Sequence, residues 1–270
     1  MQPRSPLPDI NRIGVLTAAV LLAFALTRLL PASSIVLRLT LGSFFITYPL
    51  NLTTVMTLLA AGLTATGMDW LLRSHPALGN KPTVEHWMLP TLTTFVIGIP
   101  LSLLPGGASW WVTFGIAGLA LVIVFSAEYV VVDPAAPSYS VATGLLTALS
   151  FAVYLILLTT LHSSDPRLIL LLPVVFVVSG LVSLRALHLR LQGRWEFAWA
   201  IGIAIVSAQL AAALHYWPVT SIQFALALVG PLYAITSLAG SLGEDAPVRR
   251  AAFEPLAALA LAWVAAAFLG

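Results

Sequence analysis

Apolar runs of about 20 residues recur along the whole chain, and short connections rich in proline, glycine and aspartate separate them. A helical run of this length covers the ~30 Å hydrocarbon core of a bilayer, because each residue adds about 1.5 Å. Of the 270 residues, 60% are hydrophobic and 8% are charged, whereas a soluble domain has about 25% charged residues. The sequence therefore predicts an integral membrane protein with many spans.

The apolar runs predict an all-α polytopic transmembrane helix bundle of about nine spans, which forms a single integral membrane domain over residues 1–270. Helices end readily at proline, glycine or aspartate, and nearly every junction contains one of them. The predicted spans are 13–30, 51–72, 86–104, 109–132, 139–161, 167–188, 195–216, 219–241 and 251–269.

Lysine and arginine residues divide unevenly between the two sides of this arrangement, with nine on the N-terminal side and three on the other. Cytoplasmic loops are enriched in these residues. We therefore expect a short cytoplasmic tail at 1–12 and an extracytoplasmic C-terminus. A cleaved signal peptide is the alternative for the first run, but the run is longer than a usual signal-peptide core and ends in Arg28, which favours a retained helix.

The segment between the first two spans, "SIVLRLTLGSFFITYPLN", has the period-two alternation of strands. Gly42–Ser43 interrupts the alternation with the glycine-first dipeptide of a tight hairpin turn. An open hairpin leaves unpaired backbone groups that lipid cannot satisfy. We therefore predict a small extracytoplasmic β-hairpin at about 35–49, with a short interfacial helix as the alternative.

Few ionisable residues fall within the predicted spans, and a charge in lipid is costly enough that each is a candidate functional residue. Glu128, in "VFSAEYVVVDP", is the deepest, roughly 7 Å inside the fourth span. A carboxylate at that depth needs a basic partner, and we predict Arg185, at the end of the sixth span on the same face as His188. The residues proposed to function or to anchor helices are Glu128, Arg185, His188, Gln209, Asp69 and Glu85.

The charged residues near the predicted cytoplasmic helix ends have two interpretations. They either pair with one another and anchor neighbouring helices, or they line an acidic and basic vestibule that faces the cytoplasm. Gln209 is the best mid-membrane polar side chain, and it either bonds across helices or lines a cavity. The remaining members of the set are Glu196, Glu254, Arg73 and Arg194.

No motif predicts a catalytic residue, a metal ligand or a cofactor-binding residue. The chain has no cysteine, its histidines lack the HExxH spacing, and it contains no G-x-S-x-G element. His75 and His86 flank one loop close to Asp69 and Glu85, which leaves a metal site as a weak alternative. The net charge of +2 does not indicate nucleic acid. The predicted partners are the lipid bilayer and other membrane protein subunits.

Three classes of function fit this pattern. Sparse polar chemistry favours an accessory or structural subunit that binds other membrane components. Prolines within spans suit a transporter or channel-like protein for a weakly charged small solute. A lipid-modifying membrane enzyme ranks last because it lacks a motif. A cavity containing Gln209 favours transport, and carboxylates and histidines within about 4 Å of one another favour the enzyme.

Two stretches, "GMDWLLRSHP" and "AEYVVVDP", resemble uncharacterised multi-span bacterial membrane proteins. The resemblance implies a bacterial inner membrane as the location. It implies no activity and no role for any residue.

Overall fold

The computed structural model describes residues 8–29, 34–41 and 44–269, with side chains described over 8–27 and 52–269. Within this part of the chain, nine helices are long and apolar enough to cross a membrane. The predicted number of spans is therefore confirmed, and the protein fits a multi-pass membrane protein. The contacts group into two compact units, Met1–Ala136 and Pro137–Gly270, which are described separately below.

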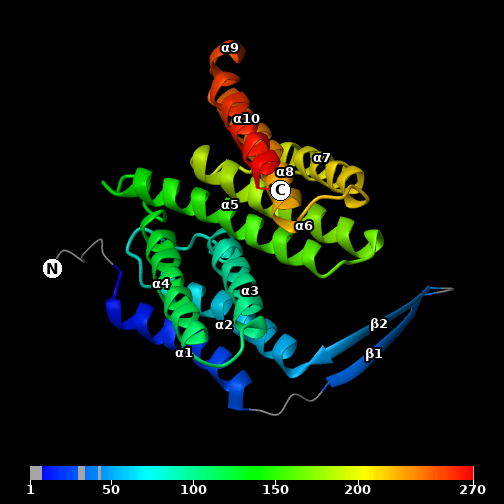
Figure 1. Ribbon diagram of the computed structural model, residues 1–270. Helices are drawn as coiled ribbons and strands as arrows, with labels where there is room; N and C mark the ends of the chain where they lie inside the picture. The colour runs from blue at the N-terminus through cyan, green and yellow to red at the C-terminus, as the bar shows by residue number, and fades with distance from the viewer. Residues whose placement is uncertain (1–7, 30–33, 42–43, 270) are drawn as a thin grey trace, which may run out of the picture. The chain divides into compact units, whose positions relative to one another are not determined.

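Four long helices make up most of the first unit. Each packs against the next along the chain, and the first also packs against the fourth, so the four helices close into a bundle (Figure 1). Its core contains Val20, Met68 and Phe125, whose side chains are fully buried or nearly so. The helices are α1 (Ile10–Leu29), α2 (Leu52–Leu72), the 3-10 turn η1 (Val84–His86), α3 (Met88–Leu103) and α4 (Ala108–Val130).

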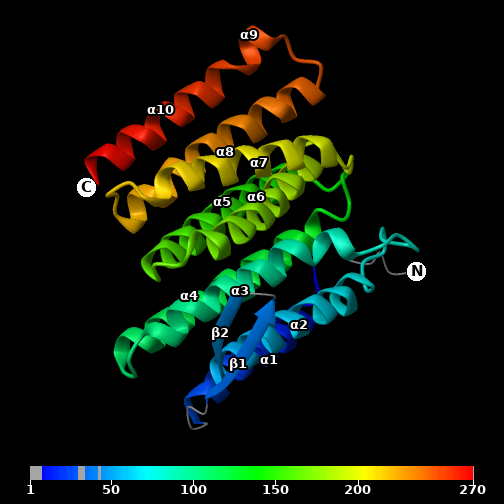
Figure 2. The ribbon, with the colours of Figure 1, turned by 90° about the vertical axis from the view of Figure 1, so that its right-hand side faces the viewer.

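Two antiparallel strands connect α1 to α2. The strands are β1 (Ser34–Leu41) and β2 (Phe44–Asn51), and they run side by side in Figure 2. Their register pairs Ser34 with Asn51 and Leu41 with Phe44. These strands occupy the segment for which the sequence predicts a hairpin. The predicted turn residues 42–43 lie outside the described residues, and the extracytoplasmic placement stays a prediction.

The second unit is organised around α8, which packs against α5, α6, α7 and α10. Of the residues in its apolar span, 56% are buried, compared with 11% for the span that contains α10. α10 packs mainly along α8, as both ribbon views show (Figures 1 and 2). The helices are α5 (Tyr139–Ser163), α6 (Leu168–Arg190), α7 (Phe197–His215), α8 (Ser221–Gly243), the single turn α9 (Val248–Ala251) and α10 (Phe253–Phe268).

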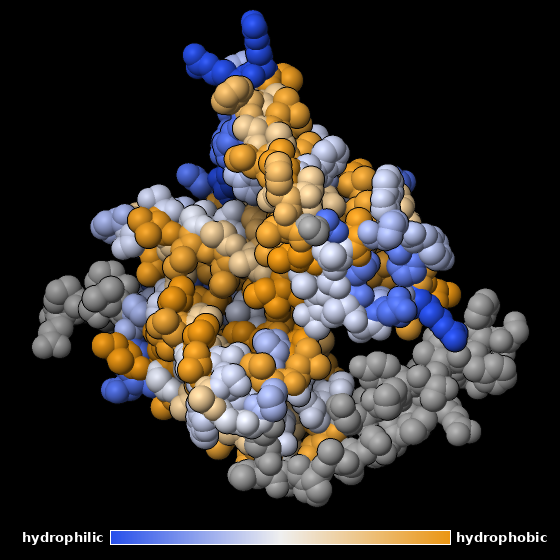
Figure 3. Space-filling model, in the orientation of Figure 1, coloured by the Kyte–Doolittle hydropathy of each residue, from blue (hydrophilic) through white to orange (hydrophobic). Residues whose placement is uncertain are grey.

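Large apolar side chains cover the outward faces of the helices. On α10 alone, Phe253, Leu261 and Phe268 are between 70% and 83% exposed. Figure 3 shows α10 as mostly apolar below a hydrophilic end at α9. Water-soluble proteins do not present apolar faces this extensive, whereas lipid chains solvate them without cost. The exposed apolar surface therefore has the chemistry expected of a lipid-facing surface.

Short connections with defined caps hold successive helices of the second unit together. α8 begins with a capping box, in which the Thr220 hydroxyl accepts from the backbone of Gln223 and the Gln223 side chain accepts from the backbone of Thr220. α5 ends close to Asp165, which has a φ of 47° and precedes a proline, and α8 ends close to Asp245, with a φ of 59°. Left-handed residues of this kind terminate helices, and aspartate tolerates the conformation better than most residues.

Candidate functional site

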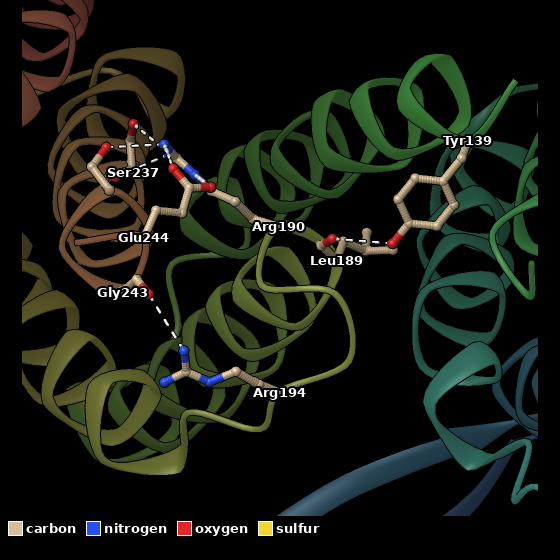
Figure 4. Close-up of polar contacts among 8 residues, drawn as sticks. Tyr139, Leu189, Arg190, Arg194, Ser237, Gly243 and Glu244 are labelled. Atoms are coloured by element: carbon tan, nitrogen blue, oxygen red, sulfur yellow. Dashed lines mark hydrogen bonds and ion pairs between the residues drawn. The ribbon is translucent and has the colours of Figure 1, made fainter. Parts of the chain in front are cut away.

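Arg190, at the end of α6, forms the most extensive polar contact network in the second unit. Its Nε and Nη2 atoms donate to the two carboxylate oxygens of Glu244, at 2.9 and 3.0 Å, which is a bidentate ion pair. Nη2 also donates to the Ser241 hydroxyl at 2.9 Å, and Nη1 donates to the Ser237 carbonyl at 3.1 Å and to its hydroxyl at 3.4 Å. Figure 4 shows the Arg190 guanidinium next to the Ser237 and Glu244 side chains.

A glycine allows this close approach between α6 and α8. A Cβ atom at Gly240 would lie 2.5 Å from Cδ of Arg190 and 2.9 Å from its Nε. With hydrogen in that place, the guanidinium lies directly across the last turns of α8 and reaches Glu244 at the helix C-cap. The ion pair holds the pKa of Glu244 below its usual range, because Arg190 donates hydrogen bonds to the charged carboxylate.

A cavity of about 730 Å³ lies beside Arg190, between α5, α6, α8 and α10. This volume falls within the range of roughly 300–1,000 Å³ that is typical of small-molecule sites. The lining combines aromatic rings, small residues, hydroxyls and two charged groups, all of which belong to the second unit. The lining residues are Tyr139, Ser140, Thr143, Gly144, Thr147, Ala148, Phe151, Ala186, Leu189, Arg190, Gln192, Tyr233, Thr236, Ser237 and Glu254.

Two threonines of the cavity wall have hydroxyls without a hydrogen-bond partner among the residues that the structure describes. Thr236 on α8 is 5% exposed, and Thr143 on α5 is half-buried with an inaccessible hydroxyl oxygen. Threonines in helices usually donate to the carbonyl four residues earlier, as Thr159 does in the same unit. Unpartnered buried polar atoms also occur elsewhere in the described part of the chain, at Thr17 among others, but these two hydroxyls belong to residues that line a cavity large enough for a ligand.

Glu254, at the start of α10, supplies the acidic side of the cavity. Its Oε1 atom accepts a hydrogen bond of 2.7 Å from the phenol of Tyr233 on α8. The Tyr233 ring meets the Phe151 ring edge to face, with centroids 5.2 Å apart. A second phenol, Tyr139, donates to the Leu189 carbonyl at 3.4 Å, and Figure 4 shows its hydroxyl pointing towards Leu189. The site thus has a carboxylate, an ion-paired guanidinium and three aromatic rings around one cavity.

Glu128, on α4 of the first unit, is fully buried. One of its contacts is with His86, a pairing that the sequence does not predict. Its Oε2 atom lies 2.8 Å from Nδ1 of His86 on η1, and Nε2 of His86 lies 3.4 Å from Oε1 of Glu85. The imidazole is therefore placed between two carboxylates. Arg185, the predicted partner, is buried on α6 of the second unit. The predicted pair would join the two units, and it stays a prediction.

His75, in the loop after α2, is buried beside this cluster. Its ring packs against Tyr129 with centroids 4.5 Å apart, and its Nδ1 atom accepts from the backbone of Ala77 at 3.1 Å. Burial lowers the pKa of His75 below the usual histidine range, because desolvation disfavours the imidazolium. Within residues 8–29, 34–41 and 44–269, no group of three or more metal-binding side chains is placed to hold an ion.

The other predicted candidates lie apart from the cavity. Asp69 pairs with Arg73 one turn later, at 2.7 Å, and accepts from Thr83 in the following loop. His188 packs on the Trp195 ring, with centroids 4.2 Å apart. Gln209 is exposed on α7 and does not line the cavity. Asp69 is thus paired within the chain, as expected of a residue that anchors neighbouring segments. Glu254 and Arg190 instead line a cavity, as expected of an acidic and basic vestibule.

Sequence reasoning missed the residues that form the centre of this site. Arg190 is one of the nine basic residues counted on the N-terminal side, and no motif in the sequence marks Glu244 or Tyr233. A usable signal was present, because Ser237, Gly240 and Ser241 repeat at the three- and four-residue spacing of one helix face. Such a stripe of small residues allows a neighbouring helix to bring an arginine close.

A helical membrane protein with a cavity between its helices, lined by apolar and polar side chains, is the class that this fold and site define. The chain belongs to the family of proteins of unknown function DUF5656, whose match covers residues 31–269. Neither the curated proteins nor the solved structures gave a match to the chain.

Proposed function

We propose that this protein is a membrane-embedded binding protein, which holds the polar part of another membrane component in the cavity of the second unit. The observation that carries the proposal is the Thr236 hydroxyl, which is buried, lines the cavity and has no partner among the described residues. A buried hydroxyl without a partner costs roughly 1–3 kcal/mol. A ligand that hydrogen-bonds to it recovers that free energy.

This proposal develops the accessory role that the sparse polar chemistry of the sequence favours. With the N-terminus in the cytoplasm of a bacterium, the cavity opens near the cytoplasmic face of the inner membrane. It takes that position because Tyr139 begins α5, Arg190 ends α6 and Glu254 lies at the start of α10. A cavity at this depth suits a ligand whose polar part lies in the headgroup layer.

Transport of a small solute has less support from the same observations. Gln209, the side chain expected to mark a transport cavity, is exposed on α7 and lies outside the cavity lining. Pro100, Pro173 and Pro231 lie inside α3, α6 and α8, each of which is one continuous helix. Discontinuous helices, which expose backbone groups to a substrate, are therefore not found at these prolines.

The convergence of His86 with Glu85 and Glu128 is the one observation that favours an enzyme. Both ring nitrogens of His86 already face carboxylates of the chain, at 2.8 and 3.4 Å. A general base needs a ring nitrogen within hydrogen-bond reach of a substrate. The arrangement therefore supports an anchor between η1 and α4 better than it supports acid–base catalysis.

The substitution Thr236→Val tests the proposed binding role, because valine keeps the shape and removes the hydroxyl. We expect the variant to be more stable than the wild type when both are stripped of lipid, since no buried hydroxyl is left unpaired. When a total lipid extract is added back, its melting temperature should rise by less than that of the wild type. Thr159→Val, on α5 outside the cavity, is the matched control. Equal responses to lipid in all three proteins would reject the proposal.

A further inference from the structure

The charged hydrogen-bonding capacity left open in the cavity is that of an acceptor. Arginine has five N–H donors, and those of Arg190 are taken up by Glu244, Ser237 and Ser241. The phenols of Tyr233 and Tyr139 also donate within the chain, to Glu254 and to the Leu189 carbonyl. The strongest donors of the cavity wall are therefore already used.

Glu254 has acceptor capacity to spare. An ionised carboxylate offers about four lone-pair sites, and the structure fills one of them with the hydroxyl of Tyr233. No lysine, arginine or histidine among the described residues forms an ion pair with Glu254, whereas Glu244 already neutralises Arg190. Arg249 and Arg250 lie on α9 and are absent from the cavity lining. Arg190 interacts electrostatically with Glu254 as well as with Glu244, so one positive and two negative side chains leave these three residues with a net charge of −1.

The remaining open groups fit a cationic donor. The hydroxyl oxygens of Thr143 and Thr236 can accept hydrogen bonds, and neither has a partner within the described part of the chain. The rings of Tyr139, Phe151 and Tyr233 line the same cavity, and aromatic faces attract cations. An anion would find no unused guanidinium donor and would lie close to the charge of Glu254.

We infer that the ligand of this cavity carries a primary ammonium group, which Glu254 binds as a charge-assisted hydrogen-bond acceptor. This inference rests on the proposed binding role of the cavity and specifies its ligand class. A primary ammonium has three N–H donors, which match the open carboxylate sites of Glu254 and the hydroxyl oxygens of Thr143 and Thr236. The O–H groups of the two threonines can in turn donate to oxygen atoms of the same ligand. The same group occurs in the ethanolamine headgroup of a phospholipid and in small free amines, so both sources are tested.

The decisive experiment measures binding to the purified full-length protein in detergent, by native mass spectrometry and thermal shift. The probes are phosphatidylethanolamine, phosphatidylcholine, phosphatidylglycerol and free ethanolamine. We expect phosphatidylethanolamine to bind at least about tenfold more tightly than phosphatidylcholine, whose methyl groups replace the N–H donors. A lipid source predicts little response to ethanolamine alone, whereas a free-amine source predicts an ethanolamine response equal to that of the lipid.

Glu254→Gln removes the charge and keeps a carbonyl oxygen for Tyr233. We expect it to lower the affinity for the ammonium probe about tenfold or more, while the control Glu196→Gln, which removes a carboxylate outside the cavity, leaves it unchanged. If Glu254→Gln does not fold, Tyr233→Phe gives the second test. This variant should bind the ammonium probe at least as tightly as the wild type, because it frees one acceptor site on Glu254.

The outcomes separate the two proposals. Equal binding of phosphatidylethanolamine and phosphatidylcholine, or a preference for phosphatidylglycerol, would overturn the ammonium inference while leaving the binding role intact, provided that Thr236→Val still weakens binding. Weaker ammonium binding by Tyr233→Phe would also overturn it, because it would show that Glu254 acts only through its contact with Tyr233. If no probe binds and Thr236→Val has no effect on lipid stabilisation, the binding role itself fails.

Discussion

The polar clusters around Glu128 in the first unit and around Arg190 in the second unit differ in what lies beside them. In the first unit, Glu128 is fully buried and both nitrogens of the adjacent His86 face carboxylates. In the second unit, Arg190 is satisfied in the same manner, but Thr236 and Glu254 beside it face a cavity of about 730 Å³. A polar cluster whose groups engage one another fastens helices together. A cluster that leaves acceptors directed at a cavity has the means to bind a ligand.

The largest effect that tests this comparison is expected from His86→Leu. The substitution removes one hydrogen-bond partner from a fully buried carboxyl group, and the loss of such a partner costs about 3 kcal/mol. We expect a loss of that size in the free energy of unfolding, measured with denaturant in detergent. His162→Leu, a half-buried histidine in α5 with one 3.3 Å contact to Ser221, should cost less than about 1 kcal/mol. Similar losses for the two variants would remove the distinction between the anchoring cluster and ordinary histidines.

Arg190→Met is expected to have the next largest effect. It keeps the apolar stem across Gly240 but strands Glu244 and the Ser237 carbonyl, at a cost of about 2–3 kcal/mol. Arg194→Met, which removes an exposed arginine bonded to Glu196, should cost less than about 0.5 kcal/mol. Thermal unfolding of both variants, followed by circular dichroism, measures the difference. If Arg190→Met is as mild as its control, the Arg190 network does not hold α6 to α8.

A smaller effect is expected from Gly240→Ala. The added methyl group would lie 2.5 Å from Cδ of Arg190, whose guanidinium is fixed by its hydrogen bonds and cannot easily move aside. We expect a loss of about 1–2 kcal/mol. At Gly202 on α7, a Cβ atom meets nothing within 4 Å, so Gly202→Ala should raise stability by up to about 1 kcal/mol. The two alanine variants differ in sign, which makes melting temperatures alone sufficient. An unchanged or raised melting temperature for Gly240→Ala would show that the contact between α6 and α8 has room to relax.

The smallest expected effect is a dependence on acidic pH. The pKa of Glu244 is lower in the folded protein than its usual value, because Arg190 binds the charged form. Its contribution to stability is therefore complete above the unfolded pKa of about 4.3 and is lost as pH falls through the lower folded value. Melting temperatures between pH 6 and pH 3 should fall more for the wild type than for Glu244→Gln. An identical pH profile for the two proteins would contradict the ion pair.

The sequence predicts the membrane helices well because their signal is local. Each span is an apolar run of sufficient length, and the capping box at Thr220 or the Asp165 junction can be read from neighbouring residues. The grouping of contacts into two units could not be predicted in this way, and the sequence indicated a single domain. Contacts between distant segments depend on how helix faces match, which no single apolar run specifies.

The same limit explains the outcome for the candidate site. Glu128 was found because a buried carboxylate is conspicuous in an apolar run, but the contact with His86 spans 42 positions of sequence and depends on η1 turning back towards α4. Glu254 was recognised as a helix-end charge, whereas its place in a cavity depends on α10 lying along α8. Residue type predicted which side chains need partners. The packing of the helices determined which partners they have.

The position of α10 gives the cavity an unusual dependence on the surrounding membrane. This helix packs mainly on α8 and exposes most of its apolar side chains, yet it carries Glu254. A helix that is bounded chiefly by acyl chains adjusts its tilt and depth to bilayer thickness more readily than one enclosed by protein. We therefore expect a change in bilayer thickness to alter the separation between Glu254 and Tyr233. Under the proposed binding role, we expect lipid composition to affect both the supply of headgroups and the width of the site that would receive them.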